Sequence, residues 1–341
     1  MTGPDVIVVG AGPGGAATAI LLAERGLQVL VLDRATGLGR PYRDHAIGLS
    51  RSVLDAILVD RLRALPVELR EGVRVTDLVI EGDRVTGIEA VDDAGRSETI
   101  RAPLVVGADG RASVVAHRLG CRQPHRLRRI ALVTYVAGLA DCRDAGEIFV
   151  DPPDYAILNP LAPDRVNMSL VVPLEHLASW RGRLATFFAA RVTQLPHLAR
   201  RIAGAERVAA VEAMGPLAYQ VTPPRHGGVL LVGDAAGFYD PLTGEGIFSA
   251  LRGAELAAAT AARALAGGDV SVPALAEYGR ARRAVFADKQ RFTRGLQFVV
   301  RHRRVANLTA HILARRPDLL DLTLGVGGDF VPPRALLSHL F

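Results

Sequence analysis

Residues 5–33 read DVIVVGAGPGGAATAILLAERGLQVLVLD, and this stretch decides the fold. It predicts a strand at Asp5–Val9, a glycine turn at Gly10–Gly15, a helix at Ala16–Arg25 and a second strand at Gln28–Leu32. Both strands are continuously apolar, as expected for parallel strands that are covered on both faces. The stretch therefore predicts a βαβ unit within an α/β domain.

The turn fits the pattern G-x-G-x-x-G. Gly10 permits the tight turn, Gly12 lets the backbone approach a pyrophosphate, and Gly15 lets the helix pack closely on the strand. The helix N-terminus offers free N–H groups and a partial positive charge to phosphates. Asp33, at the end of the second strand, is placed to accept hydrogen bonds from ribose hydroxyls. The pattern predicts dinucleotide binding by Gly10, Gly12, Pro13, Gly14, Gly15, Asp33 and Arg34.

Two later stretches extend this pattern. Residues 105–113 read VVGADGRAS, a strand ending in Gly-x-Asp-Gly, and residues 228–247 read GVLLVGDAAGFYDPLTGEGI, a strand, an aspartate, a proline loop and a glycine-rich helix start. With these three ordered motifs, the chain resembles the FAD-dependent oxidoreductases of the aromatic-hydroxylase type (class A flavin monooxygenases), and equally the geranylgeranyl reductases. The resemblance covers most of residues 5–265.

The resemblance implies an α/β protein with a glutathione-reductase-like, FAD-binding Rossmann fold, an inserted antiparallel β-sheet substrate domain and C-terminal helices. It implies that Asp33 binds ribose, that Asp109 is linked to both FAD and nicotinamide binding, and that Asp234 holds the ribityl chain. It places Gly244–Ile247 beside the flavin ring. The further FAD-binding residues that it implies are Arg51, Val75, Asp109, Gly110, Gly233, Asp234, Pro241, Gly244, Glu245, Gly246 and Ile247. FAD is expected to be non-covalent, with NADPH or NADH as the reductant.

The domain organisation is predicted to be discontinuous. Segments with strand-like alternation fill residues 127–220, which are expected to form the antiparallel-sheet substrate domain. Residues 1–126 and 221–270 then form the two parts of the FAD-binding domain, and residues 271–341 a C-terminal helical region.

The substrate pocket is predicted from neighbouring strands of this sheet. Tyr155, Asn159 and Met168 are the candidates for facing the flavin ring, with Tyr239 from the third motif; a half-buried sheet tyrosine explains Tyr155 equally well. No side chain in the flavin motifs is an obvious acid or base, so no catalytic residue is assigned and the cofactor is expected to carry the chemistry. The scattered histidines lack metal-ligand spacing, and no metal is expected.

Four functions compete. An NAD(P)H-dependent monooxygenase, hydroxylating or epoxidising a lipophilic or aromatic, polyketide- or isoprenoid-like molecule, is favoured over a reductase that saturates prenyl double bonds. Residues 233–247 are closer to the reductases, but the 17 residues between Asp33 and Arg51 leave no room for the reductases' cysteine-containing glycine segment. A halogenase is disfavoured because that family uses a lysine between flavin and substrate, in the N-terminal part, and a Trp-x-Trp motif. Here Lys289 is the only lysine and Trp180 the only tryptophan. A non-catalytic lipid carrier is disfavoured because the flavin motifs are intact.

Bulk composition agrees with a globular protein of two joined domains: 341 residues, 49% apolar and 22% charged. Two cysteines exclude a disulfide framework, and no signal-peptide pattern begins the chain, so a cytoplasmic location is expected. Aromatic residues are scarce, at 5%, and do not alternate with basic ones, which argues against nucleic-acid binding.

The C-terminal region is strongly basic. Between residues 280 and 316 it carries ten arginines and Lys289, with Phe286, Phe292, Leu296, Phe298 and Val299 interspersed. This pattern fits an amphipathic helix that contacts an anionic membrane surface or steers an anionic substrate. A solvated helix face in an arginine-rich chain explains it without a partner, and is the interpretation that the sequence favours.

Overall fold

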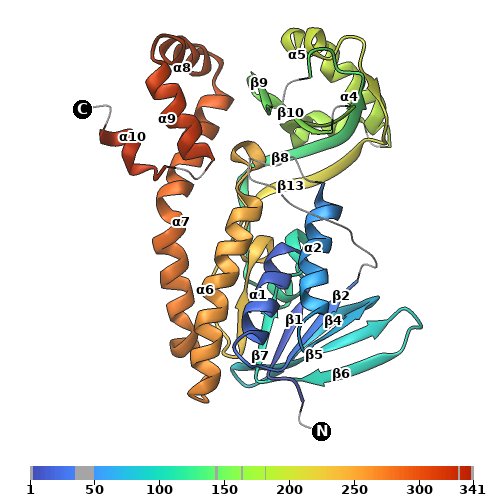
Figure 1. The fold of residues 1–341 in the computed structure, drawn as a ribbon, viewed down its shortest axis with the longest axis vertical. Helices are drawn as coiled ribbons and strands as arrows, with labels where there is room; N and C mark the ends of the chain where they lie inside the picture. Colours follow the sequence, from blue (N-terminus) through green and yellow to red (C-terminus); the bar gives the residue numbers. More distant parts are fainter. Residues whose placement is uncertain are drawn as a thin grey trace. The chain divides into compact units, whose positions relative to one another are not determined.

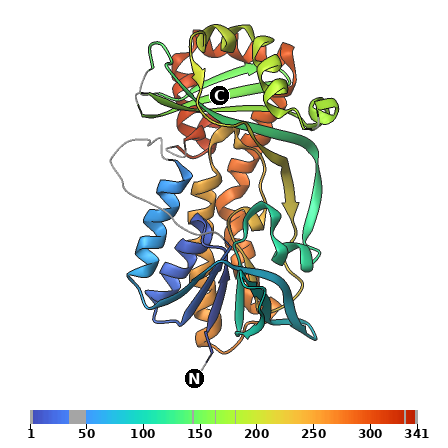
Figure 2. The ribbon, with the colours of Figure 1, turned by 90° about the vertical axis from the view of Figure 1, so that its right-hand side faces the viewer.

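The computed structural model describes residues 3–34, 50–142, 145–162, 164–180, 182–328 and 331–338. These residues form two compact units (Figures 1 and 2). Unit 1 contains residues 3–34, 51–124 and 219–287, and unit 2 is built chiefly from residues 125–218 and 288–338. In the sequence, residues 125–218 of unit 2 therefore stand between two segments of unit 1.

Unit 1 is organised around a five-stranded parallel sheet of order β14-β7-β1-β2-β3. Its strands are β1 (Val6–Val9), β2 (Val29–Asp33), β3 (Val67–Glu71), β7 (Leu104–Gly107) and β14 (Val229–Leu231). All four residues of β1 are buried, as the unbroken apolar run predicts for a central parallel strand. The predicted βαβ unit and the later parallel strands are therefore confirmed.

Each face of this sheet is covered by a different layer. Helices α1 (Pro13–Ala23), α2 (Arg51–Arg63) and α6 (Gly246–Ala266) pack on one face, where alanines such as Ala19 and Ala257 allow close approach. The other face packs against an antiparallel sheet and α3 (Val114–Arg118). Alternate residues of β1 belong to the two different cores, as the two-residue period of a strand requires.

The antiparallel sheet of unit 1 contains β4 (Val73–Glu81), β5 (Arg84–Asp92) and β6 (Ser97–Arg101). The turn between β4 and β5 contains Gly82 with a φ of +61°, a conformation that glycine adopts without strain. The two alternating segments on either side of Gly82-Asp83 pair as an antiparallel hairpin.

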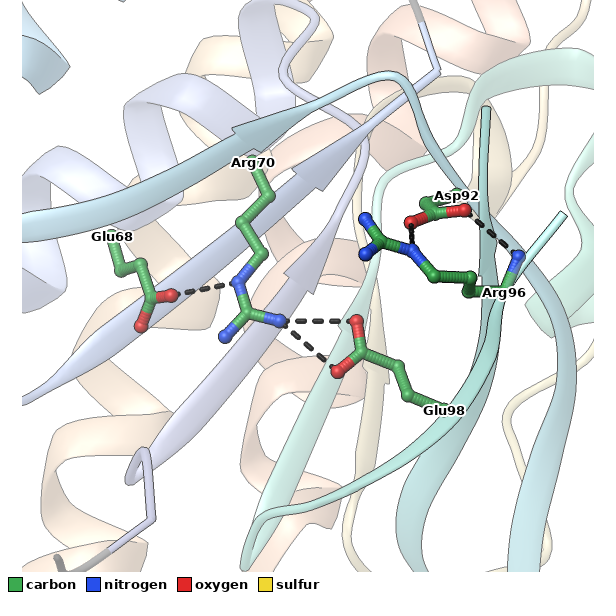
Figure 3. A network of polar contacts seen from close by, with 5 residues as sticks. All are labelled: Glu68, Arg70, Asp92, Arg96 and Glu98. Carbon is green, nitrogen blue, oxygen red and sulfur yellow. Dashed lines mark hydrogen bonds and ion pairs between the residues drawn. The ribbon is translucent and has the colours of Figure 1, made fainter. Parts of the chain in front are cut away.

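A network of ion pairs fixes the edge of unit 1 (Figure 3). Arg70 of β3 donates from Nε to Glu68 at 2.7 Å and from Nη1 to Glu98 of β6 at 3.0 Å, so it joins the parallel and antiparallel sheets. Beside it, Asp92 accepts the backbone N–H of Arg96 at 2.9 Å and its Nε at 2.6 Å. These bonds close the β5–β6 turn and lower the pKa of Asp92, the backbone N–H most strongly.

Unit 2 is built on a six-stranded antiparallel sheet, with order β12-β8-β11-β10-β9 and β13 also paired to β8. Helices α4 (Leu184–Thr193) and α5 (Pro196–Arg201) pack on one face of it. The strands are β8 (Arg122–Ala137), β9 (Glu147–Asp151), β10 (Asp154–Ala162), β11 (Arg165–Pro173), β12 (Glu206–Arg207) and β13 (Glu212–Val221).

The C-terminal residues are helical but do not form a separate region. In α7 (Val272–Arg301), residues 272–287 belong to unit 1 and the rest to unit 2, with the helices that follow. These are α8 (Arg303–Arg315), α9 (Pro317–Gly327) and α10 (Arg334–Ser338). Across the described ranges, no helix combines the length and apolarity that crossing a bilayer demands.

Candidate functional site

A cavity of about 360 Å³ lies in unit 1 at the carboxyl ends of the parallel strands, the edge at which open α/β sheets bind ligands. The ends of β1, β2, β3 and β7 contribute to it, together with the start of α2 and of β4. It brings together many of the predicted cofactor residues, namely Gly10, Gly12, Asp33, Arg34, Arg51, Val75, Asp109 and Gly110.

Glycine is needed at Gly10, Gly12 and Gly15 for different structural reasons. A Cβ on Gly10 would lie 2.6 Å from the carbonyl oxygen of Ala108, and one on Gly15 would lie 1.9 Å from that of Gly10. A Cβ on Gly12 would approach only the Arg51 guanidinium, at 3.8 Å. Gly10 and Gly15 are therefore required by the protein's own packing. Gly12, at the N-terminus of α1, leaves open space that a pyrophosphate fits.

Asp33 holds the glycine turn in place. Its Oδ2 accepts the backbone N–H of Ala11 at 2.5 Å, and the N–H of Gly10 donates to the carbonyl of Leu32 at 2.7 Å. The carboxylate also lines the cavity. Its predicted contact with ribose stays a prediction, but its position at the end of β2 is the one that this contact requires.

Asp109 follows β7, and its two carboxylate oxygens have different hydrogen-bonding environments. Its Oδ2 accepts the N–H groups of Val114 at 2.6 Å and Val115 at 3.3 Å, and so caps α3. Its Oδ1 is buried and has no hydrogen-bond partner within the described ranges. Burial raises the pKa of this carboxyl group. A buried, half-satisfied carboxylate is costly, and its position in the cavity suits it to a ligand hydroxyl or N–H group.

Asp234 lies on the 3₁₀ turn η3 (Gly233–Ala236), directly after β14. Burial raises the pKa of its carboxyl group, while the positive charges of Arg111 and Arg51 oppose that shift. A Cβ on Gly14 would lie 3.4 Å from the Cα of Gly233, so the first and third motifs pack directly on each other. The turn η3 also contacts η1 (Gly110–Ala112) of the second motif. Three segments far apart in sequence thus converge in unit 1.

The third motif, including Asp234, lies outside the lining of the 360 Å³ cavity. Pro241 begins the turn η4 (Pro241–Thr243), Gly244 ends it with a φ of +70°, and Glu245 precedes α6. The α6 N-terminus is formed by Gly246 and the partly exposed Ile247. Contacts of these residues with a flavin stay predictions.

The predicted substrate group is wrong in one respect. Met168 pairs with Leu158 on β10, whereas Tyr155 and Asn159 are odd-numbered positions of that strand. Because side chains alternate along a strand, Met168 points to the opposite face from Tyr155 and Asn159. It is completely buried in the core beneath α4 and α5. The roles of Tyr155, which is also fully buried, Asn159 and the half-buried Tyr239 are untested.

Sequence analysis missed two residues that support the site. The hydroxyl of Tyr219 donates to the backbone carbonyl of Asp234 at 2.6 Å, and burial raises the pKa of that phenol. The Arg122 guanidinium lies over the Tyr219 ring, 4.2 Å from its centroid, and donates to the backbone carbonyl of Arg111. The pair ties the second motif to the third. No sequence motif marks either residue.

Comparisons with known proteins agree with this geometry. The model of the family described as FAD binding domain matches residues 42–293, and that of the NAD(P)-binding Rossmann-like domain matches residues 8–51. The chain is 26% identical over 334 residues to digeranylgeranylglycerophospholipid reductase 2 of Methanococcoides burtonii, covering 80% of this chain and 78% of that protein. It is 28% identical over 344 residues to digeranylgeranylglycerophospholipid reductase 1 of Methanothermobacter thermautotrophicus, with coverages of 85% and 84%.

Solved structures show the same fold. The flavin-dependent brominase Bmp2 matches with a TM-score of 0.82 at 19% identity, covering 99% of this chain and 98% of its own. A geranylgeranyl bacteriochlorophyll reductase-like protein of Thermoplasma acidophilum matches with a TM-score of 0.75 at 18% identity, covering 88% of both chains. At these identities the likeness establishes the predicted FAD-binding α/β fold and leaves the reaction open.

Substitution of the motif glycines separates cofactor binding from folding. Gly12→Val should fold normally but weaken FAD binding by ~100-fold or more, ~2.7 kcal/mol, because its side chain fills the pyrophosphate space. Gly15→Ala should instead lower the free energy of unfolding by about 1–3 kcal/mol, because its Cβ overlaps backbone. Flavin titration and denaturant unfolding of both variants measure this. Unchanged FAD affinity in Gly12→Val contradicts the assignment.

Tyr219 has a matched control in Tyr278, whose hydroxyl donates to the carbonyl of Leu231 at 2.6 Å and is likewise buried. Tyr219→Phe and Tyr278→Phe should each lower the free energy of unfolding by about 1 kcal/mol. Only Tyr219→Phe should also weaken FAD binding, about fivefold, because only it releases the Asp234 turn. Equal FAD dissociation constants for the two variants would show that Tyr219 has no positioning role.

Proposed function

This chain belongs to the FAD binding domain family and is an FAD-dependent oxidoreductase, and on that premise we propose that it saturates carbon–carbon double bonds in a prenyl-type lipophilic substrate. The observation that carries the cofactor assignment is the convergence of the Gly10–Gly15, Asp109 and Asp234 segments in unit 1. NADPH or NADH is proposed as the reductant.

The chain's own residues have binding roles in this proposal. The N-terminus of α1 and the bare backbone of Gly12 would hold the pyrophosphate, and Asp33 the ribose. Asp234, on the turn that packs against Gly14, would hold the ribityl hydroxyls. Bound FAD supplies the hydride chemistry. The half-satisfied carboxylate of Asp109 provides a further acceptor for a ligand donor group.

The titratable residues that line the cavity are carboxylates and arginines, without lysine, histidine or cysteine within the described ranges. The one lysine, Lys289, is buried in unit 2 and donates to the backbone carbonyls of Val326 and Gly327. Halogenation that depends on a lysine beside the flavin therefore has no support, despite the fold shared with the brominase. Position and polarity are the protein's contribution to the reaction.

Double-bond reduction is supported by relatives that are named digeranylgeranylglycerophospholipid reductases and span about four fifths of the chain. Their names describe a polyisoprenoid phospholipid. The Gly233–Gly237 and Gly244–Ile247 segments, which are closer to reductases than to phenol hydroxylases, point the same way.

Monooxygenation, favoured by the sequence alone, remains the second candidate. The observation behind it is that the interval between Asp33 and Arg51 has no room for the reductases' cysteine-containing glycine segment, although the hydroxylases' substrate-proximal loop is missing from the same gap. Both reactions consume NAD(P)H, but they differ in the fate of the substrate and of O2. Reduction adds a hydride and a proton across a double bond. Monooxygenation transfers one oxygen atom to the substrate and releases the other as water.

One experiment distinguishes the two reactions. Protein loaded with FAD and NADPH or NADH is given geranylgeranyl lipids and phenolic substrates, once without oxygen and once under ¹⁸O2, and products are analysed by mass spectrometry. The proposal predicts saturated isoprenoid product without oxygen, and no label under ¹⁸O2. Product that forms only with oxygen and carries one ¹⁸O atom would replace it with monooxygenation.

A further inference from the structure

Helix α8 has an unusual surface for a helix of a folded unit. Its sequence, RRVANLTAHILAR, carries Arg303, Arg304 and Arg315 and no acidic residue. None of its side chains is buried. A helix with basic and large aliphatic side chains exposed together is typical of segments that lie in a membrane interface.

The aliphatic side chains of α8 and α9 are exposed in pairs. On α8, Leu308 is 59% and Ile312 45% exposed, and on α9, Leu320 is 37% and Leu324 59% exposed. Each pair is spaced by four residues, so its members lie on one side of their helix. The two helices pack against each other (Figure 1). Among the described residues, the three most exposed large apolar side chains are Leu308, Leu324 and Phe298.

The basic side chains share the face of the aliphatic ones. Arg304, Leu308, Ile312 and Arg315 follow spacings of three and four residues, which place them along one side of α8. Neither Arg304 nor Arg315 has an acidic partner in the part of the chain that the structure describes. By contrast, Arg303 of the same helix pairs with Asp151.

The exposed surface of α8 and α9 differs from the amphipathic surface that the sequence indicated along α7. Phe286, the first apolar residue singled out on α7, is buried, and Phe292, Leu296 and Val299 are half-buried. Only Phe298 of that group is exposed. The candidate surface therefore lies on α8 and α9, with Phe298 at the end of α7, and not along the length of α7.

We propose that α8 and α9 form a peripheral membrane-docking surface, in which Arg304 and Arg315 bind anionic phospholipid headgroups and Leu308 and Ile312 enter the interface. Charge complementarity selects this occupant. The arginine-bearing face of α8, a helix without acidic residues, matches an anionic headgroup layer, and its aliphatic side chains match the acyl boundary beneath it. Helix α9, which carries Asp318 and Asp321, contributes its exposed leucines only. The inference rests on the geometry of unit 2 and not on the reaction type.

The test is co-sedimentation of the full chain with vesicles of phosphatidylcholine and phosphatidylglycerol, compared with phosphatidylcholine alone. Wild type should bind only the anionic vesicles, and less at 1 M than at 0.1 M salt, because the Debye length shrinks from ~10 Å to ~3 Å. Arg304→Gln with Arg315→Gln should lower the partition coefficient about 25-fold, roughly fivefold for each arginine. Leu308→Asn with Ile312→Asn should lower it at least tenfold.

Two control variants make the same types of substitution at exposed positions of unit 2 outside α8 and α9. Arg128→Gln with Arg207→Gln removes two exposed arginines, and Ile148→Asn with Val208→Asn removes two exposed aliphatic side chains. Both should bind vesicles like wild type. Equal loss in control and α8 variants, or no binding at 0.1 M salt, overturns the proposal. Light scattering of the same proteins measures their oligomeric state. If wild type does not bind vesicles but is a dimer, and Leu308→Asn/Ile312→Asn is a monomer, the surface is a contact between two copies of the chain.

Discussion

The close approach of Gly14 to Gly233 is the constraint on which the site depends. These residues are more than two hundred positions apart, yet their backbones pack with no side chain between them. The contact joins the helix start proposed for the pyrophosphate to the turn that carries Asp234. A Cβ at position 14 would lie in van der Waals contact with Gly233, at 3.4 Å, so alanine fits there but a longer side chain would separate the two motifs. The proposed cofactor site thus depends first on backbone packing, which brings the motifs together, and then on the side chains that they carry.

The buried carboxylates show what the site costs the protein. Asp109 and Asp234 both have a raised pKa because burial disfavours their charged form. A carboxyl group whose pKa is raised on folding destabilises the folded state as pH rises through the unfolded-state value toward neutrality. Such groups are retained where a ligand compensates them. Tyr219 and Arg122 hold the turns that present them, which explains why residues outside any motif matter to the site.

Much of this arrangement could be predicted from the sequence. The parallel strands were recognisable because their apolar runs are unbroken, and the β4–β5 hairpin because Gly82-Asp83 separates two alternating segments. Strand β3 was not recognisable from the sequence, because its residues, VELRE, include three charged side chains at the exposed edge of the sheet. Met168 was misplaced because period-two alternation fixes a face only once the strand register is known. The contact of Tyr219 with Asp234 joins positions that no local pattern connects. Residues 35–49, most of the short interval between Asp33 and Arg51, lie outside the described residues.

Hydrogen exchange of the protein with and without FAD tests most directly whether three separated segments form one cofactor site. FAD should slow exchange of the backbone N–H groups in Gly10–Gly15, in Gly110–Ser113 and in Gly233–Ala236 together, while the β4–β5 turn at Gly82-Asp83, which bonds to Gly227 ahead of β14 and does not line the cavity, stays unchanged. Slowed exchange in the first segment alone would contradict the account, because the motifs at Asp109 and Asp234 would then take no part in holding the cofactor.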